Sequence, residues 1–115
     1  MSDRQTSKRR GYISTVLVLL PLTGTGAWAT DFTAKVVMEK MKAEERYPYI
    51  AGVVEGLAYA RYERDGKKTE SMKCIYDWFY EKPESINLIY AAFGRYSEFT
   101  PGAIIGALVA KSCGD

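Results

Sequence analysis

The two cysteines, Cys74 and Cys113, are the residues most able to do chemistry in this chain. They are its only cysteines, and they lack the Cys-x-x-Cys spacing of redox sites. We expect them to form a structural disulfide rather than to bind zinc or attack a substrate. The bond would close a loop of about 40 residues, a closure that stabilises a fold by about 4 kcal/mol on chain-entropy grounds.

Other catalytic groups are scarce. The chain has no histidine, the commonest general base and the commonest metal ligand. No nucleophile elbow, phosphate-binding glycine loop or zinc-protease helix occurs in the sequence. Glu55 is a lone carboxylate, and hydrolysis would need a second group; we expect it at the surface or in an ion pair with Arg61 or a basic residue of another helix. The sequence therefore predicts a non-enzymatic protein without a metal site or cofactor.

Tyrosines are the best candidates for partner binding, and the chain has nine of them. Tyrosine combines a rigid contact area with a polar tip, which suits protein interfaces. Tyr76, Asp77 and Tyr80 fall opposite the core face of one predicted helix, and Tyr59 and Tyr62 fall off the apolar face of the preceding one. Either these residues form a partner surface, or the tyrosine rings fill a small core while their hydroxyl groups reach water.

The first 29 residues have the three parts of a secretory signal peptide. Lys8, Arg9 and Arg10 are followed by an apolar run at 12–22 and by Ala27-Trp28-Ala29, after which we predict cleavage. The apolar run is too short for a lasting membrane span. We therefore predict an exported protein, in the bacterial periplasm or secreted, where a disulfide persists.

Removal of this segment changes the net charge of the chain. Four of the 16 basic residues and one of the 14 acidic residues lie in it, which leaves 12 basic and 13 acidic residues and a net charge of −1. A nearly neutral domain lacks the basic surface that nucleic-acid-binding proteins need. We therefore expect no nucleic-acid partner.

Residues 30–115 read as one small all-α domain. Apolar residues recur at helical intervals, and no segment alternates long enough to indicate a strand. We predict a bundle of about four to five helices tied by the disulfide. The first expected helix begins at Thr30 or Asp31, and the second spans 48–63 after a break or kink at Pro48. The third carries Cys74 behind a cap at Thr69 or Ser71, the fourth ends near Tyr96, and the fifth runs from Thr100-Pro101 to Cys113.

Gly52, Gly56 and Ala60 stand four residues apart in the second of these helices. Glycine inside a helix costs about 1 kcal/mol relative to alanine, so a stripe of small residues indicates that another helix passes close by. That helix belongs either to the same chain or to a second copy in a homodimer. We expect a packing seam here rather than a ligand site.

Three segments carry a family resemblance. They are Tyr-Ile-Ala-Gly-Val-Val-Glu-Gly at 49–56, Cys74 with a helix that ends in Lys-Pro-Glu at 82–84, and the helix at 101–113 that ends in Lys-Ser-Cys. Together they resemble the Rap/Tai immunity family, small exported helical proteins that inhibit cell-wall amidase effectors of type VI secretion. The same architecture is similar to the Hde-type periplasmic chaperones. The resemblance covers 47–113, and at 46–48 the chain lacks a further cysteine that the family often has.

The resemblance implies an inhibitor that docks on a peptidoglycan amidase effector and blocks its active-site cleft. Residue chemistry alone predicts only a protein-binding module. One alternative is an acid-stress chaperone, which would open when its carboxylates lose their charge, because no histidine titrates near neutral pH. A second alternative is an accessory envelope protein with no soluble client.

Overall fold

The computed structural model describes residues 32–115. These residues form five α-helices and one π-helical turn, without a strand, which confirms the prediction of an all-α fold. The elements are α2 (Ala34–Lys40), α3 (Ala43–Arg64), α4 (Glu70–Tyr76), η2 (Asp77–Glu81), α5 (Glu84–Arg95) and α6 (Pro101–Cys113). The predicted signal peptide and the helix start expected at Thr30 or Asp31 lie outside the described residues, and α2 begins at Ala34.

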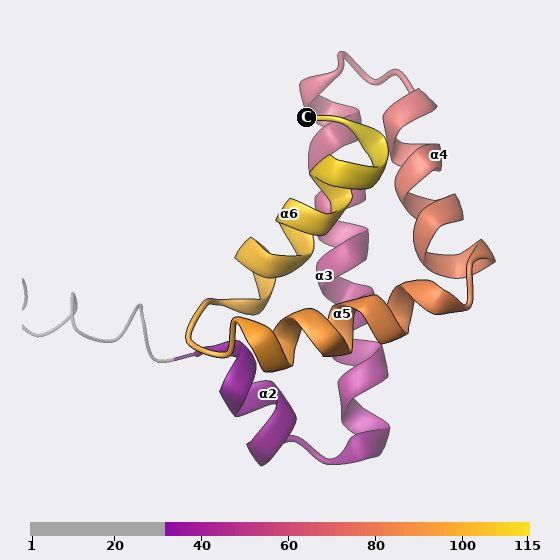
Figure 1. The fold of residues 1–115 in the computed structure, drawn as a ribbon. Helices are drawn as coiled ribbons and strands as arrows, with labels where there is room; N and C mark the ends of the chain where they lie inside the picture. The colour runs from indigo at the N-terminus through magenta and orange to yellow at the C-terminus, as the bar shows by residue number, and fades with distance from the viewer. Residues whose placement is uncertain (1–31) are drawn as a thin grey trace, which may run out of the picture. The chain divides into compact units, whose positions relative to one another are not determined.

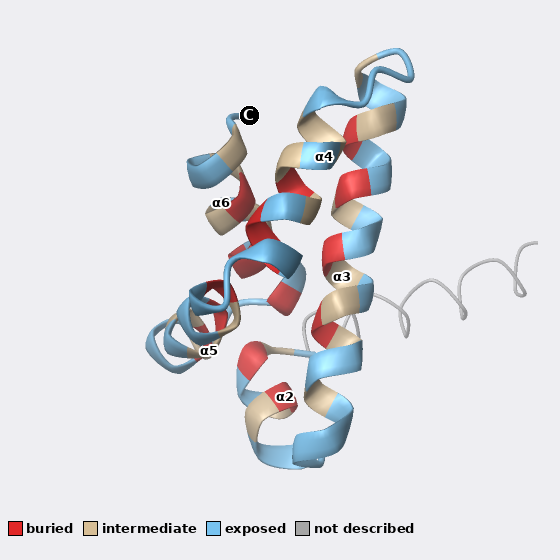
Figure 2. Ribbon diagram, turned by 90° about the vertical axis from the view of Figure 1, so that its right-hand side faces the viewer, coloured by how far each residue is buried: buried red, intermediate tan, exposed pale blue. Residues whose placement is uncertain are grey.

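The longest helix, α3, is the element around which the others are arranged (Figure 1). α4 runs back beside it, α6 packs against both α3 and α4, and α5 crosses in front of α3 (Figure 1). α2 lies near the start of α3 and contacts α5 (Figure 1). The buried residues form a single core cluster, and they lie on the sides of the helices that face one another (Figure 2).

Every helix contributes to that core, mostly through the residues that helical spacing predicts. Phe32 precedes α2 and is 43% exposed, although its spacing from Val36 and Val37 predicts a place on the core face of the first helix. Its ring packs edge to face against Tyr49, with 5.7 Å between centroids. The buried apolar residues are Ala34, Val37, Ile50, Val54, Ala58, Ile75, Trp78, Phe79, Ile89, Phe93, Ile104, Ile105 and Val109.

The predicted helix break at Pro48 is wrong. The helical structure is interrupted earlier, at Met41 and Lys42, which have extended backbone angles. The helix α3 then runs for 22 residues. The Glu45 carboxylate accepts a hydrogen bond of 3.2 Å from the backbone N–H of Lys42, which starts the helix ahead of the proline. Pro48 lies close to that start, so it removes only one hydrogen bond, to the carbonyl of Glu44, and the rest of the helix outweighs the loss.

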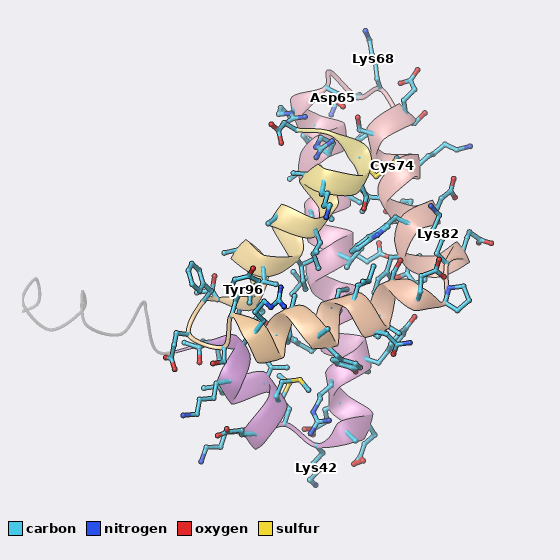
Figure 3. The ribbon with its side chains drawn as sticks, in the orientation of Figure 1. Lys42, Asp65, Lys68, Cys74, Lys82 and Tyr96 are labelled. Atoms are coloured by element: carbon cyan, nitrogen blue, oxygen red, sulfur yellow. A yellow bond between two sulfur atoms is a disulfide. The ribbon has the colours of Figure 1, made fainter. Side chains whose placement is uncertain are left out.

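The disulfide between Cys74 and Cys113 is present, as predicted (Figure 3). The two Cα atoms are 5.9 Å apart, within the usual range for a disulfide. The bond ties α4 to the last residue of α6. At the start of α6, the predicted helix cap at Thr100 is also confirmed, since its hydroxyl oxygen accepts a hydrogen bond of 3.3 Å from the backbone N–H of Ala103.

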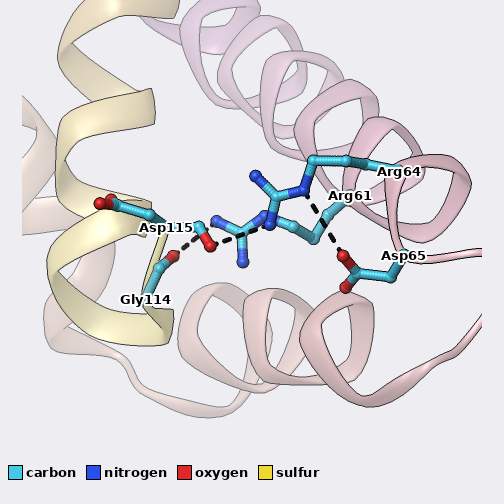
Figure 4. A network of polar contacts seen from close by, with 5 residues as sticks. All are labelled: Arg61, Arg64, Asp65, Gly114 and Asp115. Atoms are coloured by element: carbon cyan, nitrogen blue, oxygen red, sulfur yellow. Dashed lines mark hydrogen bonds and ion pairs between the residues drawn. The ribbon is translucent and has the colours of Figure 1, made fainter.

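Two arginines fasten the end of α3 to the residues that follow α6 (Figure 4). The buried Arg61 donates from Nη2 to the carbonyl of Gly114 at 2.7 Å, and Arg64 donates to the carbonyl of Asp115 at 2.9 Å. Arg61 thus binds a backbone carbonyl. Of the alternatives given for Glu55, the ion pair with Arg61 does not form, and the surface position is observed.

Candidate functional site

The candidate site is built on the π-helical turn η2, which continues α4 without a break. A π turn holds more residues than an α turn and changes the direction of the side chains that follow. Trp78 and Phe79 are both buried here, whereas the next residue, Tyr80, remains 46% exposed. The Ser85 hydroxyl donates to the carbonyl of Trp78, which satisfies one of the acceptors at the end of the turn.

Glu55 on α3 joins two tyrosines of the neighbouring α4–η2 segment. The Tyr76 hydroxyl donates to Oε1 of Glu55 at 3.2 Å, and the Tyr80 hydroxyl donates to Oε2 at 2.7 Å. The two tyrosine rings lie side by side, with 6.2 Å between their centroids. One carboxylate therefore fixes two tyrosines that stand 21 and 25 residues further along the chain.

Tyr47 completes this surface from the first turns of α3. Its ring stacks on Phe79 with centroids 5.6 Å apart, and Phe79 in turn meets the edge of Tyr80 at 4.9 Å. Tyr47 is 45% exposed, while Phe79 is buried beneath it. We call the group of Tyr47, Glu55, Tyr76 and Tyr80 the tyrosine surface.

The hydroxyl groups of Tyr76 and Tyr80 stay protonated well above neutral pH. The hydrogen bond to Glu55, with smaller contributions from burial and from the charge of Glu55, raises the pKa of Tyr80 to about 12. Burial, followed by the same kind of hydrogen bond, raises the pKa of Tyr76 above its usual value. A tyrosine with a raised pKa transfers protons poorly near pH 7, so this arrangement suits binding better than acid–base catalysis.

Sequence reasoning named Tyr76 and Tyr80 but treated Glu55 as an unrelated surface group and missed Tyr47. Tyr47 stood at the expected helix break and was therefore not placed on a helix face. A signal was present, because Tyr47 and Glu55 are eight residues apart on the helix as observed and Tyr76 and Tyr80 are four apart. This spacing places the two residues of each pair near one another along a helix. It does not show that the two helices pack together.

The structure separates the other three predicted site residues from the tyrosine surface. Asp77 lines a shallow hollow beside the disulfide, together with Lys73 and Lys82. Tyr59 donates a hydrogen bond of 2.8 Å to Glu63 on its own helix, and its ring lies 6.2 Å from that of Tyr62. The prediction of one stripe formed by Tyr76, Asp77 and Tyr80 is therefore correct only for the two tyrosines.

Within residues 32–115, no helix packs closely against the two glycines of the seam expected along α3. Gly52, Gly56 and Ala60 are all exposed. A Cβ atom added at either glycine would meet nothing within 4 Å. The interpretation as an intrachain seam is thus wrong at the two glycines, whereas Ala60 lines a small hollow with Gly106 and Val109 of α6. Packing against a second copy stays a prediction.

A second hollow lies between α5 and α6, with a volume of about 460 Å³. We call it the α5–α6 groove. Tyr96 and Phe99, which are 48% and 59% exposed, stand at the connection between the two helices, with 6.1 Å between their ring centroids. The lining residues are Ala92, Tyr96, Phe99, Ala103, Ile104, Ala107, Leu108 and Lys111.

Two further observations concern the part of the chain that the structure describes. Residues 32–115 contain no cluster of three or more acidic, cysteine or histidine side chains able to hold a metal ion. Within the same range, none of the helices has both the length and the apolar character that a membrane crossing requires.

Comparison of the chain with protein-family models, curated proteins and solved structures found no significant match. The resemblance to the Rap/Tai family therefore stays a prediction.

Proposed function

We propose that this protein is a non-enzymatic binding module that docks onto another protein through the tyrosine surface. The double hydrogen bond from Tyr76 and Tyr80 to Glu55 is the observation that supports this most. It orders two large side chains before a partner arrives, which lowers the entropic cost of binding. Tyrosine is also one of the residues that most often carries the binding energy of protein interfaces.

The chemistry of the tyrosine surface suits a partner with both apolar and hydrogen-bonding groups. The rings of Tyr47 and Tyr80, each about half exposed, offer apolar contact area. Each hydroxyl of Tyr76 and Tyr80 already donates a hydrogen bond to Glu55, so its oxygen lone pairs are left to accept from a partner. A backbone N–H or an amide side chain at the rim of a cleft would satisfy them.

For the partner class, we propose a peptidoglycan amidase effector, on the strength of the sequence resemblance to the Rap/Tai family. Docking over the cleft of such an enzyme would exclude its substrate without any reaction on this chain. The disulfide between Cys74 and Cys113 supports a location in an oxidising compartment, and we propose the periplasm, where such effectors act.

Photo-crosslinking in cells would test this proposal. A benzophenone amino acid replaces Tyr80 in one variant and, as a control with the same exposure, Tyr96 in another. Cells that receive a secreted amidase are irradiated, and the crosslinked species are identified by mass spectrometry. We expect a crosslink to the amidase from position 80 and none from position 96.

Equal crosslinking from both positions, or none to an amidase from either, would contradict the proposal. Protection of unrelated, acid-denatured proteins at pH 3, with no amidase bound at pH 7, would instead favour the chaperone alternative.

A further inference from the structure

The α5–α6 groove has the composition of a small-molecule site. Ala92 comes from α5, and Ala103 and Ala107 come from α6, so short side chains line it from both helices and leave space between them. Its volume of about 460 Å³ falls in the range of small-molecule sites, which are mostly apolar with few polar groups. The tyrosine surface shares no residue with this groove, so the inference is independent of the proposed function.

The charge of the groove is concentrated at one place. Lys111 is the single charged residue among those that line it, and no acidic side chain does so. From Ala103 to Lys111 the distance along α6 is about 12 Å. The aromatic residues Tyr96 and Phe99 stand near the start of α6, and Lys111 stands near its end. The groove therefore combines an apolar stretch with one cationic side chain, at the end farther from Tyr96 and Phe99.

From this combination we infer that the groove binds an amphiphilic carboxylate, such as a fatty acid of medium chain length. The hydrocarbon chain would lie against the alanines and Leu108, where burial of each methylene group is favourable. The carboxylate would meet the ammonium group of Lys111, which is exposed, so neither charge has to leave water completely. A cationic amphiphile of equal length would be repelled.

The dimensions favour a single hydrocarbon chain over a polypeptide helix. A helix with its side chains is about 10–12 Å across, and it buries its apolar face along several turns of a longer groove. This groove extends over only about two turns of α6. One extended chain fills such a space, whereas a helix would rest on its rim.

Decanoate is the probe for the first test. The disulfide-bonded protein is titrated below the micellar concentration, and backbone amide shifts are followed by nuclear magnetic resonance. We expect saturable shifts confined to the groove, at Ala92, Ala103, Ala107 and Lys111. Because each methylene is worth roughly a factor of four, octanoate should bind about 15-fold more weakly. Shifts spread over the whole surface, or no dependence on chain length, would overturn the inference.

Charge and space are then tested by substitution. Lys111→Met should weaken decanoate binding about threefold to fivefold, and it should remove the preference for decanoate over decanol. The matched control Lys73→Met, in the hollow beside the disulfide, should change neither. Ala107→Leu should block the groove. If that variant fails to fold, the result for Lys111→Met, a change at an exposed residue, decides the outcome. Decanol binding as tightly as decanoate to the unchanged protein would contradict the inference.

Discussion

The tyrosine surface and the α5–α6 groove both expose aromatic rings, but they hold them in different ways. Tyr80 and Tyr96 are almost equally exposed, at 46% and 48%. Tyr80 donates a hydrogen bond to a carboxylate on another helix, whereas the ring of Tyr96 packs edge to face on its neighbour Phe99. Exposure alone therefore does not distinguish a prepared contact surface from the rim of a hollow. The cross-helix hydrogen bond does, because it fixes ring position before binding.

The two regions should differ most in how much a phenylalanine ring at each contributes to the stability of the fold. Phe79→Ala should lower the free energy of unfolding by about 3 to 5 kcal/mol, because Phe79 is buried under Tyr47 and Tyr80. Phe99→Ala, at the groove, should cost less than about 1 kcal/mol because the ring is 59% exposed. Urea unfolding measures both. Equal losses of unfolding free energy would show that the ring of Phe79 contributes no more to stability than the exposed ring of Phe99.

Glu55→Gln should also change how tyrosines titrate. The raised pKa of Tyr80, about 12 against an ordinary value of 10.0, favours the protonated hydroxyl in the folded protein. Its contribution to stability is complete below pH 10 and is lost as the pH rises from about 10 to about 12. In the variant, the pKa of Tyr80 should fall toward 10, as read from tyrosinate absorbance. An unchanged alkaline titration would contradict the role given to Glu55.

The same substitution should have a moderate effect on stability. Glu55→Gln replaces the shared charged acceptor of Tyr76 and Tyr80. We expect the free energy of unfolding to fall by about 1 kcal/mol, a modest amount because the hydrogen bonds are exposed to solvent. Glu63→Gln is the control, since Glu63 accepts from Tyr59 and Lys67 within four residues on either side. These contacts should matter less, because they are local and lie in the solvent. A larger loss at Glu63 would reverse the comparison.

The smallest effect is expected beside the tyrosine surface, on the outward face of α3. Gly52→Ala should raise the free energy of unfolding by about 0.5 to 1 kcal/mol, because the new methyl group meets no atom within 4 Å and alanine favours the helix. Thermal unfolding at several protein concentrations measures this. If the variant were less stable, and its stability depended on concentration, this face would belong to a dimer.

Local signals explain which parts of the fold were predictable. The apolar spacing of Ile104, Ile105 and Val109, and the Thr100-Pro101 start of α6, are properties of neighbouring residues, and the structure confirms them. The disulfide followed from the number of cysteines. The prediction at Pro48 was wrong because a proline disturbs a helix only weakly near a helix start that is fixed by other contacts.

The tyrosine surface was only partly predictable because it depends on contacts distant in sequence. Nothing near Glu55 indicates that its acceptors face residues 21 and 25 positions away. The π turn also escaped prediction, since apolar periodicity assumes a regular helix. Sequence could thus nominate Tyr76 and Tyr80 by type and spacing, whereas their shared partner required the fold.

Inhibition of a secreted peptidoglycan amidase by paired variants tests the central claim most directly. The double variant Tyr47→Ala with Tyr80→Ala removes the exposed rings of the tyrosine surface, and Tyr96→Ala with Phe99→Ala removes those of the groove. We expect the first to weaken inhibition at least 30-fold, the loss of about 2 kcal/mol typical of an interface hot spot, and the second to leave it unchanged. Equal inhibition by both double variants would contradict docking through the tyrosine surface.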